Sequence, residues 1–506
     1  MIIKSPVLYD SKGAPITSSS SFYQYRKPNA RHAGALQNWV PQRLFNDTDA
    51  ARERETISAR VIDICNADPN ANGVIEAFAS TVIGTGLNPN YTIDSKKSGL
   101  SKEKIDLIKK QMFDNFKEWQ YFSDMQGQKT FAQILFLLEK SLVKYGEYFV
   151  LLPMIDDDER PFSLACQVIH PMRVKTPADK IHDEKIRDGV EFNAKYQPIA
   201  YWVKKNGDYD DSSKNFHRIT RKSGHRYKVI HYFNPDDPEQ VRGISMLSPM
   251  LKLFRDFADY LDAELMSNVV TAAFSMFIET NADPYTQAQN LATITDNGFK
   301  SDNSSYEQRY QEMVPGQIMY GSPGEKPHPI SASRPGGTFD PFTRIIKKAI
   351  AQGLGIPFPV LYRDFDGMNY ASYRSAMLEA WRVFKRHRED IGTAFCQPVH
   401  DMIQEEAFLR DKLDVNYYEM PKSFFNAKWI GPPKGQIEPI KELQADIIAI
   451  QNNLKTRSQV ITEQGGSDNF ESIVEKIKEE QELLKNFGLD EQPFVKEDER
   501  DDSNEF

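Results

Sequence analysis

The chain has 506 residues, of which 40% are hydrophobic and 27% are charged, as in an ordinary globular protein long enough for about three domains. No run reaches the roughly 18 apolar residues that a membrane span needs, so we expect no membrane partner. The three cysteines, Cys65, Cys166 and Cys396, lie far apart in the sequence and form no metal-ligand spacing. They are typical of small hydrophobic residues buried in a protein of a reducing compartment.

The net charge of -9 is concentrated at one end of the chain. Residues 471–506 hold 13 acids and 5 bases, so the rest of the molecule is nearly neutral. The opposite end is basic, with a single acid, Asp10, before Asp47 and with bases at Lys12, Arg26, Lys27, Arg31 and Arg43. This segment is either a basic arm that touches an acidic surface or neighbouring subunit, or a solvated arm, and the sequence leaves both open.

The first half of the chain begins with polar residues and continues with helical patterns. Residues 1–50 show no sustained hydrophobic period and are predicted to be an extended arm. Helical patterns follow over 51–83, with a break from Asn66 to Pro69 and a cap at Asn70 or Asn72. A second helix is predicted over 101–119. A third begins with Thr130 as its cap and leads into a strand near residue 147.

A change of period marks the middle of the chain. Residues 160–235 contain short runs rich in β-branched and aromatic residues between Gly, Asn and Asp, which predicts an antiparallel sheet. Ser248 followed by Pro249 predicts a capped helix that runs to about Phe277. Residues 279–337 are polar and are predicted to form a small α/β insertion. A basic helix is then expected from Asp340 to Gln352.

The segment GLGIPFPVLYRDFDGMNYASYRSAMLEAW, residues 353–381, is a loop broken by Pro and Gly between two long helices. The second helix is expected to start near Asn369, and further helices at 437–454, 456–464 and 469–487. The apolar stripe of that long helix consists of Tyr373, Met377, Trp381, Phe384, Ile391, Phe395, Val399 and Met402. The fold class is therefore α+β and mostly helical, with a small antiparallel β region.

A search for catalytic chemistry yields only fragments. Gly84-Thr85-Gly86 follows a helix and is best explained as its end, and Ser141 with Lys144 forms an SxxK pattern in mid-helix. Asp364-x-Asp366-Gly367 resembles the start of a calcium loop but lacks the later ligands. The nine histidines form no paired-ligand spacing. We predict no catalytic residues, no metal, no cofactor and no enzymatic activity.

Two rows of bases are the more informative feature. Arg344, Lys347 and Lys348 lie at helical spacing before the loop, and Arg363 stands within the loop. Arg382, Lys385 and Arg386 repeat the spacing after it. Such rows suit phosphate contacts without base recognition, although a solvated helix face or salt bridges between subunits would give the same pattern.

Five motifs in order resemble the lambda family of portal proteins of tailed bacteriophages. They cover most of the chain, from about residue 30 to 489. They are NADPNANGVIEAFASTVIGTGLNPN, RGISMLSPMLKLFRDFADYLDAEL, MVPGQIMYGSPGEKP with RPGGTFDPF, the loop segment 353–381, and KWIGPPKGQIEPIKELQADIIAIQNNLKTRSQVITEQGGSDNFESIVEKI.

This resemblance implies a portal fold with wing, stem, clip and crown regions. The implied division is an N-terminal arm (1–50), wing (51–243), first stem helix (244–275), clip (276–339), second stem helix (340–355), tunnel loop (356–370), long helix of wing and crown (371–420), crown helices (421–489) and disordered acidic tail (490–506). The residues implied to face the DNA channel are Arg363, Asp364, Asp366, Met368, Asn369 and Tyr370, with the basic helix faces of Arg344, Lys347, Lys348, Arg382, Lys385 and Arg386.

The resemblance also implies partners. The protein would be a homo-oligomer, a ring normally of twelve subunits at one capsid vertex of the virion, assembled in the host cytoplasm. Double-stranded DNA would pass through it without sequence specificity. The terminase large subunit, the head–tail connector and the major capsid protein would contact it. Two other hypotheses are a nucleic-acid enzyme of phage assembly, such as a terminase or nuclease, and a monomeric head-completion or adaptor protein.

Overall fold

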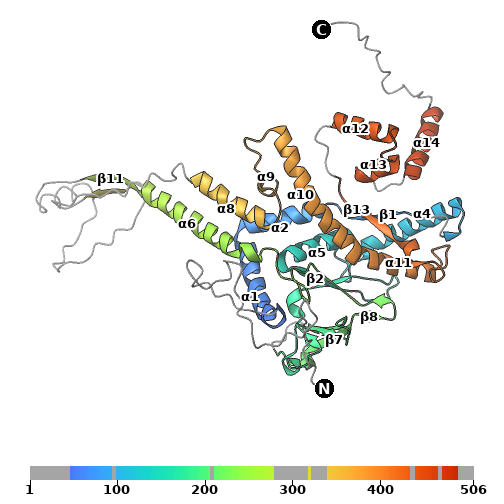
Figure 1. Cartoon of the computed structure of the whole chain (residues 1–506), viewed down its shortest axis with the longest axis horizontal. Helices are drawn as coiled ribbons and strands as arrows, with labels where there is room; N and C mark the ends of the chain where they lie inside the picture. The colour runs from blue at the N-terminus through green and yellow to red at the C-terminus, as the bar shows by residue number, and fades with distance from the viewer. Residues whose placement is uncertain are drawn as a thin grey trace, which may run out of the picture.

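The computed structural model describes residues 46–93, 98–205, 210–278, 317–320, 339–433, 439–464 and 470–487. Figure 1 shows a mixed body from which helices α6 and α8 project together on one side, while α12, α13 and α14 form a separate group. The longer helices are α1 (Asn46–Ala67), α2 (Pro69–Val82), α4 (Lys102–Trp119), α5 (Phe131–Tyr145), α6 (Leu251–Ala273), α8 (Phe339–Gly353), α10 (Tyr370–Ile391), α11 (Gln397–Leu409), α12 (Pro439–Gln451) and α14 (Phe470–Asn486), and the shorter α13 (Arg457–Glu463) lies between α12 and α14 in the chain. The predicted α+β, mostly helical class is confirmed.

Small sheets complete the body. A four-stranded antiparallel sheet has the order β4-β5-β6-β7, and a three-stranded antiparallel sheet has the order β10-β2-β3. β1 pairs with β13 and β8 with β9, both antiparallel, while β11 and β12 are parallel. The strands are β1 (Asn88–Tyr91), β2 (Glu147–Leu151), β3 (Gln167–Ile169), β4 (Ile186–Arg187), β5 (Val190–Phe192), β6 (Pro198–Lys204), β7 (Phe216–Thr220), β8 (Lys222–Ser223), β9 (Arg226–Tyr227), β10 (Val229–Phe233), β11 (Phe274–Ile278), β12 (Gln317–Tyr320) and β13 (Ala427–Ile430).

Local sequence signals account for the ends of several helices. Thr130 begins α5 with a capping box in which the Gln133 side chain accepts from the Thr130 N–H at 2.9 Å. Gly146 ends the same helix at φ 77°, and a Cβ there would lie 2.0 Å from the Ile244 oxygen. Only glycine fits this position. The predicted cap at Thr130 and the predicted helix end at Gly84 and Gly86, both at positive φ, are confirmed.

Other predicted boundaries differ from the structure. The cap of α2 is Asp68, whose Oδ1 accepts from the Asn70 N–H at 2.7 Å, so the prediction of Asn70 or Asn72 was wrong. Pro69 at the first turn makes Asp68 the natural cap, because proline lacks the N–H that a helix interior needs. Ser248 was also wrong as a cap: it lies inside the short 3₁₀ helix Ser248–Met250 that precedes α6, and the residue before that helix is Leu247, which has no capping side chain.

Three segments lie differently from their predicted spans. Helix α1 already begins at Asn46, inside the predicted arm. Helix α6 ends at Ala273, and strand β11 takes the residues predicted to be its last turn. The span 421–489, predicted to be crown helices, contains strand β13, which pairs with β1 of the body. The rest of the predicted arm, most of the predicted clip and the acidic tail lie outside the described residues.

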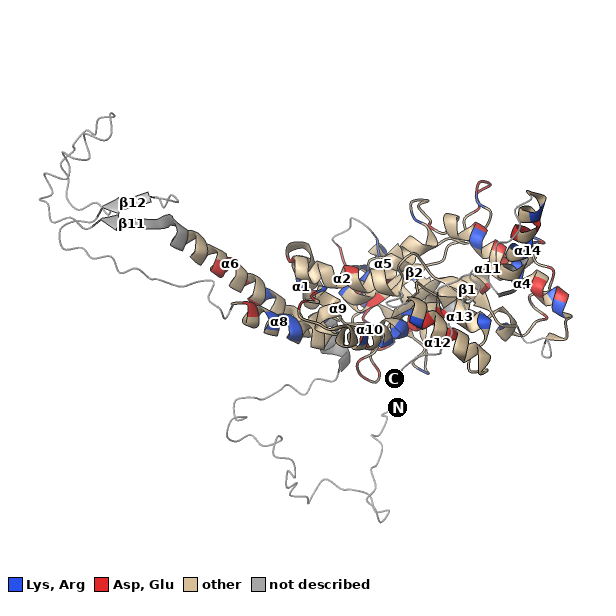
Figure 2. Ribbon diagram, turned by 90° about the horizontal axis from the view of Figure 1, so that it is seen from above, with Lys and Arg blue, Asp and Glu red and all other residues tan. Residues whose placement is uncertain are grey.

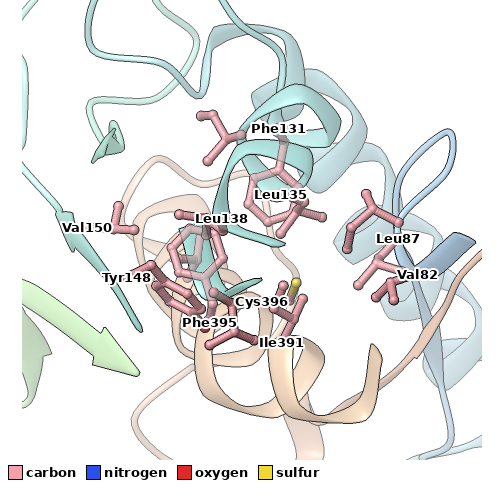
Figure 3. Close-up of a cluster of buried hydrophobic side chains, with 14 of the residues drawn as sticks. Val82, Leu87, Phe131, Leu135, Leu138, Tyr148, Val150, Ile391, Phe395 and Cys396 are labelled. Carbon is pink, nitrogen blue, oxygen red and sulfur yellow. The ribbon is translucent and has the colours of Figure 1, made fainter. Parts of the chain in front are cut away.

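The main core joins the middle of the chain to the second half. Figure 3 shows Phe131, Leu135 and Leu138 of α5 and Tyr148 of β2 around Phe395, which follows α10. Phe131 and Phe395 stack with ring centroids 5.8 Å apart. Phe395 belongs to a π-helical turn, Gly392–Cys396, that joins α10 to α11, so residues 370–409 form one uninterrupted helical rod. The predicted apolar stripe is buried from Phe384 onward. All three cysteines are buried, as predicted.

A buried ion network fastens α1 to the sheets. Arg242 donates through Nη2 and Nε to the two oxygens of Glu147 at 2.5 and 2.7 Å. His231 Nε2 lies 3.1 Å from Glu147, and Arg54 of α1 binds Asp188 at 2.5 Å. Burial acts to raise the pKa of Glu147, but Arg242 and His231 together outweigh it and hold that pKa well below its usual range. The network therefore holds charged groups in the interior by mutual pairing.

Candidate nucleic-acid interface

The predicted tunnel loop lies between α8 and α10, and the structure gives it a defined course. A short helix, α9 (Phe358–Tyr362), occupies its middle. Arg363 ends α9 in the left-handed conformation at φ 55°, and Gly367 turns the chain at φ 69°. Asn369 is the cap of α10, because its side chain accepts from the Ser372 N–H at 2.9 Å. The predicted helix start near Asn369 is confirmed, and the side chain's role here is to hold α10.

Arg344 of α8 is surrounded by carboxylates. It lies 3.1 Å from Asp340 on its own helix, 3.4 Å from Asp364 and 3.8 Å from Asp366 of the loop. Both predicted loop acids therefore face the predicted basic helix. The arrangement links the loop to α8 and lowers the positive charge that Arg344 presents to solvent.

The two lysines of α8 lie over aromatic rings. The Lys347 ammonium is 5.8 Å from the Phe257 centroid of α6 and 5.5 Å from the Tyr362 centroid of α9. Lys348 lies 5.9 Å from the Phe358 centroid. These cation–π contacts join α6, α8 and α9 while leaving both charges in place.

The predicted bases on α10 pair along their own helix. Arg382 lies 2.8 Å from Glu379, and Lys385 lies 3.9 Å from Glu389. The third base, Arg386, is 3.9 Å from Asp390 and also donates to the Asn234 side chain at 3.0 Å. These pairs are exposed, so each contributes little to stability. They belong to the solvated face that the sequence left open as an alternative.

Arg363 differs from the other predicted bases. Among the described residues it is the only predicted base whose side chain has no ion pair, hydrogen bond or ring contact. Its side chain is exposed, as are Tyr370 and Asn369, while Met368 is half-buried. Sequence reasoning overlooked Arg374, exposed one turn into α10. A helical step of four residues from Tyr370 would have pointed to it.

The projecting pair of helices next to this loop exposes apolar side chains. On α6 these are Leu265, Met266 and Val269, each more than half exposed, and on α8 they are Phe342 and Ile345. The two helices meet through Tyr260, whose ring centroid lies 4.9 Å from that of Phe342. Figure 2 shows α6 and α8 leaving the body together, with Lys and Arg along α8.

Sequence comparisons agree with this structure. The family described as phage portal protein, lambda family, matches residues 32–388, which is more than two thirds of the chain. The chain is 22% identical over 500 residues to the portal protein of Escherichia phage N15, covering 95% of this chain and 94% of that one. It is 20% identical over 486 residues to portal protein B of Escherichia phage lambda, covering 92% and 91%.

A solved structure was also found. A chain from the neck of an empty GTA particle, computed with C6 symmetry, matches with a TM-score of 0.43 and 11% identity, covering 80% of this chain and 93% of that one.

The sequence relatives place the protein among the structural proteins of phage virions. The match over residues 32–388 is decisive, and the chain belongs to the lambda family of phage portal proteins. No described helix is long and apolar enough to cross a bilayer.

Proposed function

We propose that this protein forms the ring, of twelve copies, through which double-stranded DNA enters and leaves a capsid at one vertex. Family membership supports the proposal. In it, α6 and α8 are the stem, the loop at 356–370 faces the DNA, and α12 to α14 belong to the crown. The clip at 276–339 would dock the terminase large subunit and the head–tail connector, and the wing would contact the major capsid protein.

Exposed apolar side chains on the projecting helices carry the ring proposal. Leu265, Met266 and Ile345 are each 63 to 64% exposed, on two helices that leave the body with solvent around them. Burial of such side chains gives about 25 cal/mol for each Å² of apolar surface removed from water. Copies of α6 and α8 packed side by side around an axis would bury them. A ring of this kind needs two different faces on each subunit, and two unlike helices supply them.

The crown helices show the same property. Ile440, Leu443 and Ile448 of α12 are all more than half exposed, as are Leu454 after α12 and Leu483 of α14. Figure 1 shows this group of helices set apart from the body. Neighbouring copies of the group would cover these side chains in a closed assembly.

The charges around the loop suit a cargo that has to slide. Residues 339–370 contain four bases and three acids, and the acids Asp364 and Asp366 lie beside Arg344. Every phosphate that a base neutralises adds counterion-release free energy, so unpaired bases in large number would hold DNA in place. Among the described residues, Arg363, Lys347 and Lys348 have no carboxylate partner, and these three bases beside the neutralised Arg344 give few and weak contacts without sequence recognition. The family match favours this function over a terminase, a nuclease or an adaptor.

The ring is tested by molar mass and by end-on electron micrographs of the purified protein. We expect a hollow ring of twelve copies of the 58.1 kDa chain. Replacing Leu265 and Ile345 together by Lys should abolish rings, because two charges per subunit would be buried between copies. Met154→Lys, at a residue 46% exposed on the body, is the matched control and should keep them. Compact solitary particles from the unmodified chain would refute the proposal.

A further inference from the structure

Two adjoining cavities lie along β4, β5 and the turn that joins β5 to β6. We call them together the hairpin groove. They have volumes of about 670 and 450 Å³ and share Arg187, Phe192 and Tyr196 as lining residues. The first is also lined by Ile181 and Ile199, and the second by an apolar set. That set is Val190, Pro198, Phe233 and Val241.

The groove has an unusually exposed apolar rim. Tyr196 is 71% exposed and Ile181 is 64% exposed. Tyr196 has φ 57° and Glu239 has φ 67°, although large side chains rarely adopt positive φ. The turn that begins at Asn193 holds Tyr196 in this conformation through a hydrogen bond from its N–H to the Asn193 oxygen at 3.0 Å. The backbone thus fixes an aromatic ring at the mouth of the groove instead of in the core.

The described part of the chain begins close to this groove. Arg54 of α1 binds Asp188, the neighbour of the groove residue Arg187. Helix α1 begins eight residues before Arg54, which is about 12 Å along the helix. Figure 1 shows the start of α1 on the same side of the body as β7. Residues 1–45 are therefore tethered near the groove, and a short tether gives a segment an effective concentration of the order of millimolar.

The segment and the groove have complementary chemistry. Residues 1–45 contain six bases, one acid, and aromatic residues at 9, 22, 23, 25, 39 and 45. The lining carries four carboxylates and two bases: Asp183, Glu184, Glu191 and Lys185 in the first cavity, Glu239 in the second, and Arg187 in both. A partly apolar groove with an excess of carboxylates matches a segment rich in aromatic residues and bases.

We propose that the hairpin groove is the binding site for the N-terminal segment, residues 1–45 of this chain. Aromatic side chains of the segment fill the two cavities, and its bases lie against the carboxylates of the groove lining. The segment then covers Tyr196 and Ile181, which the body alone leaves in water. The inference stands on the groove and the position of α1, so it does not depend on the proposed ring.

Hydrogen exchange of the full-length protein tests the proposal. We expect amides within residues 17–45 to exchange more slowly than in an unstructured peptide, and Tyr196→Asn to speed them by roughly tenfold. Asparagine tolerates positive φ, so this variant keeps the turn. Tyr121→Asn is the matched control, since Tyr121 is 62% exposed far from the groove in sequence, and it should change nothing. Equal exchange in all three proteins overturns the proposal.

Zero-length crosslinking by carbodiimide identifies the occupant. Lys12 and Lys27 of the segment should become joined to Glu184 or Glu239, and Tyr196→Asn should reduce these products severalfold. Crosslinks from the groove acids to lysines beyond residue 45 of another copy, separated from those within one chain by mixing isotope-labelled and unlabelled protein, would show that the body of a second copy covers the groove. That result, like crosslinks of Lys12 and Lys27 only to other surfaces, contradicts the proposal. Because the readout is a mapped covalent bond, it remains informative whether the protein is a ring or a monomer.

Discussion

The body and the projecting helices differ in how far they bury their apolar side chains. In the body, Phe131, Tyr148 and Phe395 are completely buried where α5, β2 and the π-helical turn meet (Figure 3). On α6 and α8, Leu265 and Ile345 stand in water. The body accounts for its own stability, whereas the projecting helices leave apolar surface for other molecules to cover.

This difference indicates which parts of the sequence serve folding and which serve assembly. Buried ion pairs, capped helices and aromatic contacts join elements of the body that are far apart in sequence. The projecting pair has few such ties, chiefly the Tyr260 contacts and the rings around Lys347. Changes in the body should therefore alter the free energy of unfolding, while changes on α6, α8 and the loop should alter assembly or DNA contact.

The largest expected effect on the body comes from Arg242→Met. This change leaves the Glu147 carboxylate buried with the guanidinium gone, and loss of one partner of a buried pair costs about 3–5 kcal/mol. Thermal or chemical unfolding measures it. Arg218→Met is the matched control, because Arg218 pairs with Glu191 at 2.7 Å but is 42% exposed, and it should cost at most about 1 kcal/mol. Equal losses in the free energy of unfolding would mean that the buried network stabilises the fold no more than an exposed ion pair does.

A smaller, pH-dependent effect is expected from Asp401→Asn in α11. Burial raises the pKa of Asp401 to about 6, so the folded protein binds this proton more tightly than the unfolded chain does. The wild type therefore loses stability as the pH rises from about 4 to 6, by roughly 2–3 kcal/mol. Asparagine cannot ionise and can still accept from Gln397, which donates to Asp401 at 2.7 Å. The variant should match the wild type at pH 4 and exceed it at pH 8.

Unfolding curves at both pH values check this expectation. Asp156→Asn, in an exposed loop, is the control, because it makes the same chemical change at the surface. A constant offset for Asp401→Asn would show that its carboxyl group titrates alike in the folded and unfolded states.

Arg363→Gln is expected to have the smallest effect on the free energy of unfolding and the clearest effect on DNA binding. If Arg363 touches phosphate, its loss should lower the slope of log affinity for double-stranded DNA against log salt by up to about 0.9 for each contact. Arg344→Gln is the control, because three carboxylates already surround Arg344, and it should change the slope less. Both variants should keep the assembly and unfold within about 0.5 kcal/mol of wild type. A larger slope change for Arg344 would reverse the two roles.

Much of the fold was predictable because it is signalled locally. Thr130, Asn369 and the stripe from Phe384 to Met402 are read from a few neighbouring residues, and the structure confirms them. The loop between α8 and α10 was also predictable, because Pro357 and Gly367 interrupt two helical patterns. Its role in contacting DNA stays a prediction.

Contacts between distant residues were not predictable. Arg54 and Asp188 are 134 residues apart, and nothing near either residue signals their pairing. The same holds for β13, whose four residues lie amid helical patterns and pair with β1 more than 300 residues earlier. Arg344 illustrates the limit at the site itself: its helical spacing left phosphate contacts, a solvated face and salt bridges between subunits open, while the fold of the loop places Asp364 and Asp366 of the same chain against it.

The unbroken rod from Tyr370 to Leu409 has a mechanical consequence. At about 1.5 Å per residue its 40 residues span about 60 Å. Its first turns extend from the body beside the loop, and its far half is clamped in the core at Phe395. A force on the loop would therefore bend the free end of the rod relative to its buried half. The π-helical turn at Gly392 lies where the exposed part of the rod enters the core.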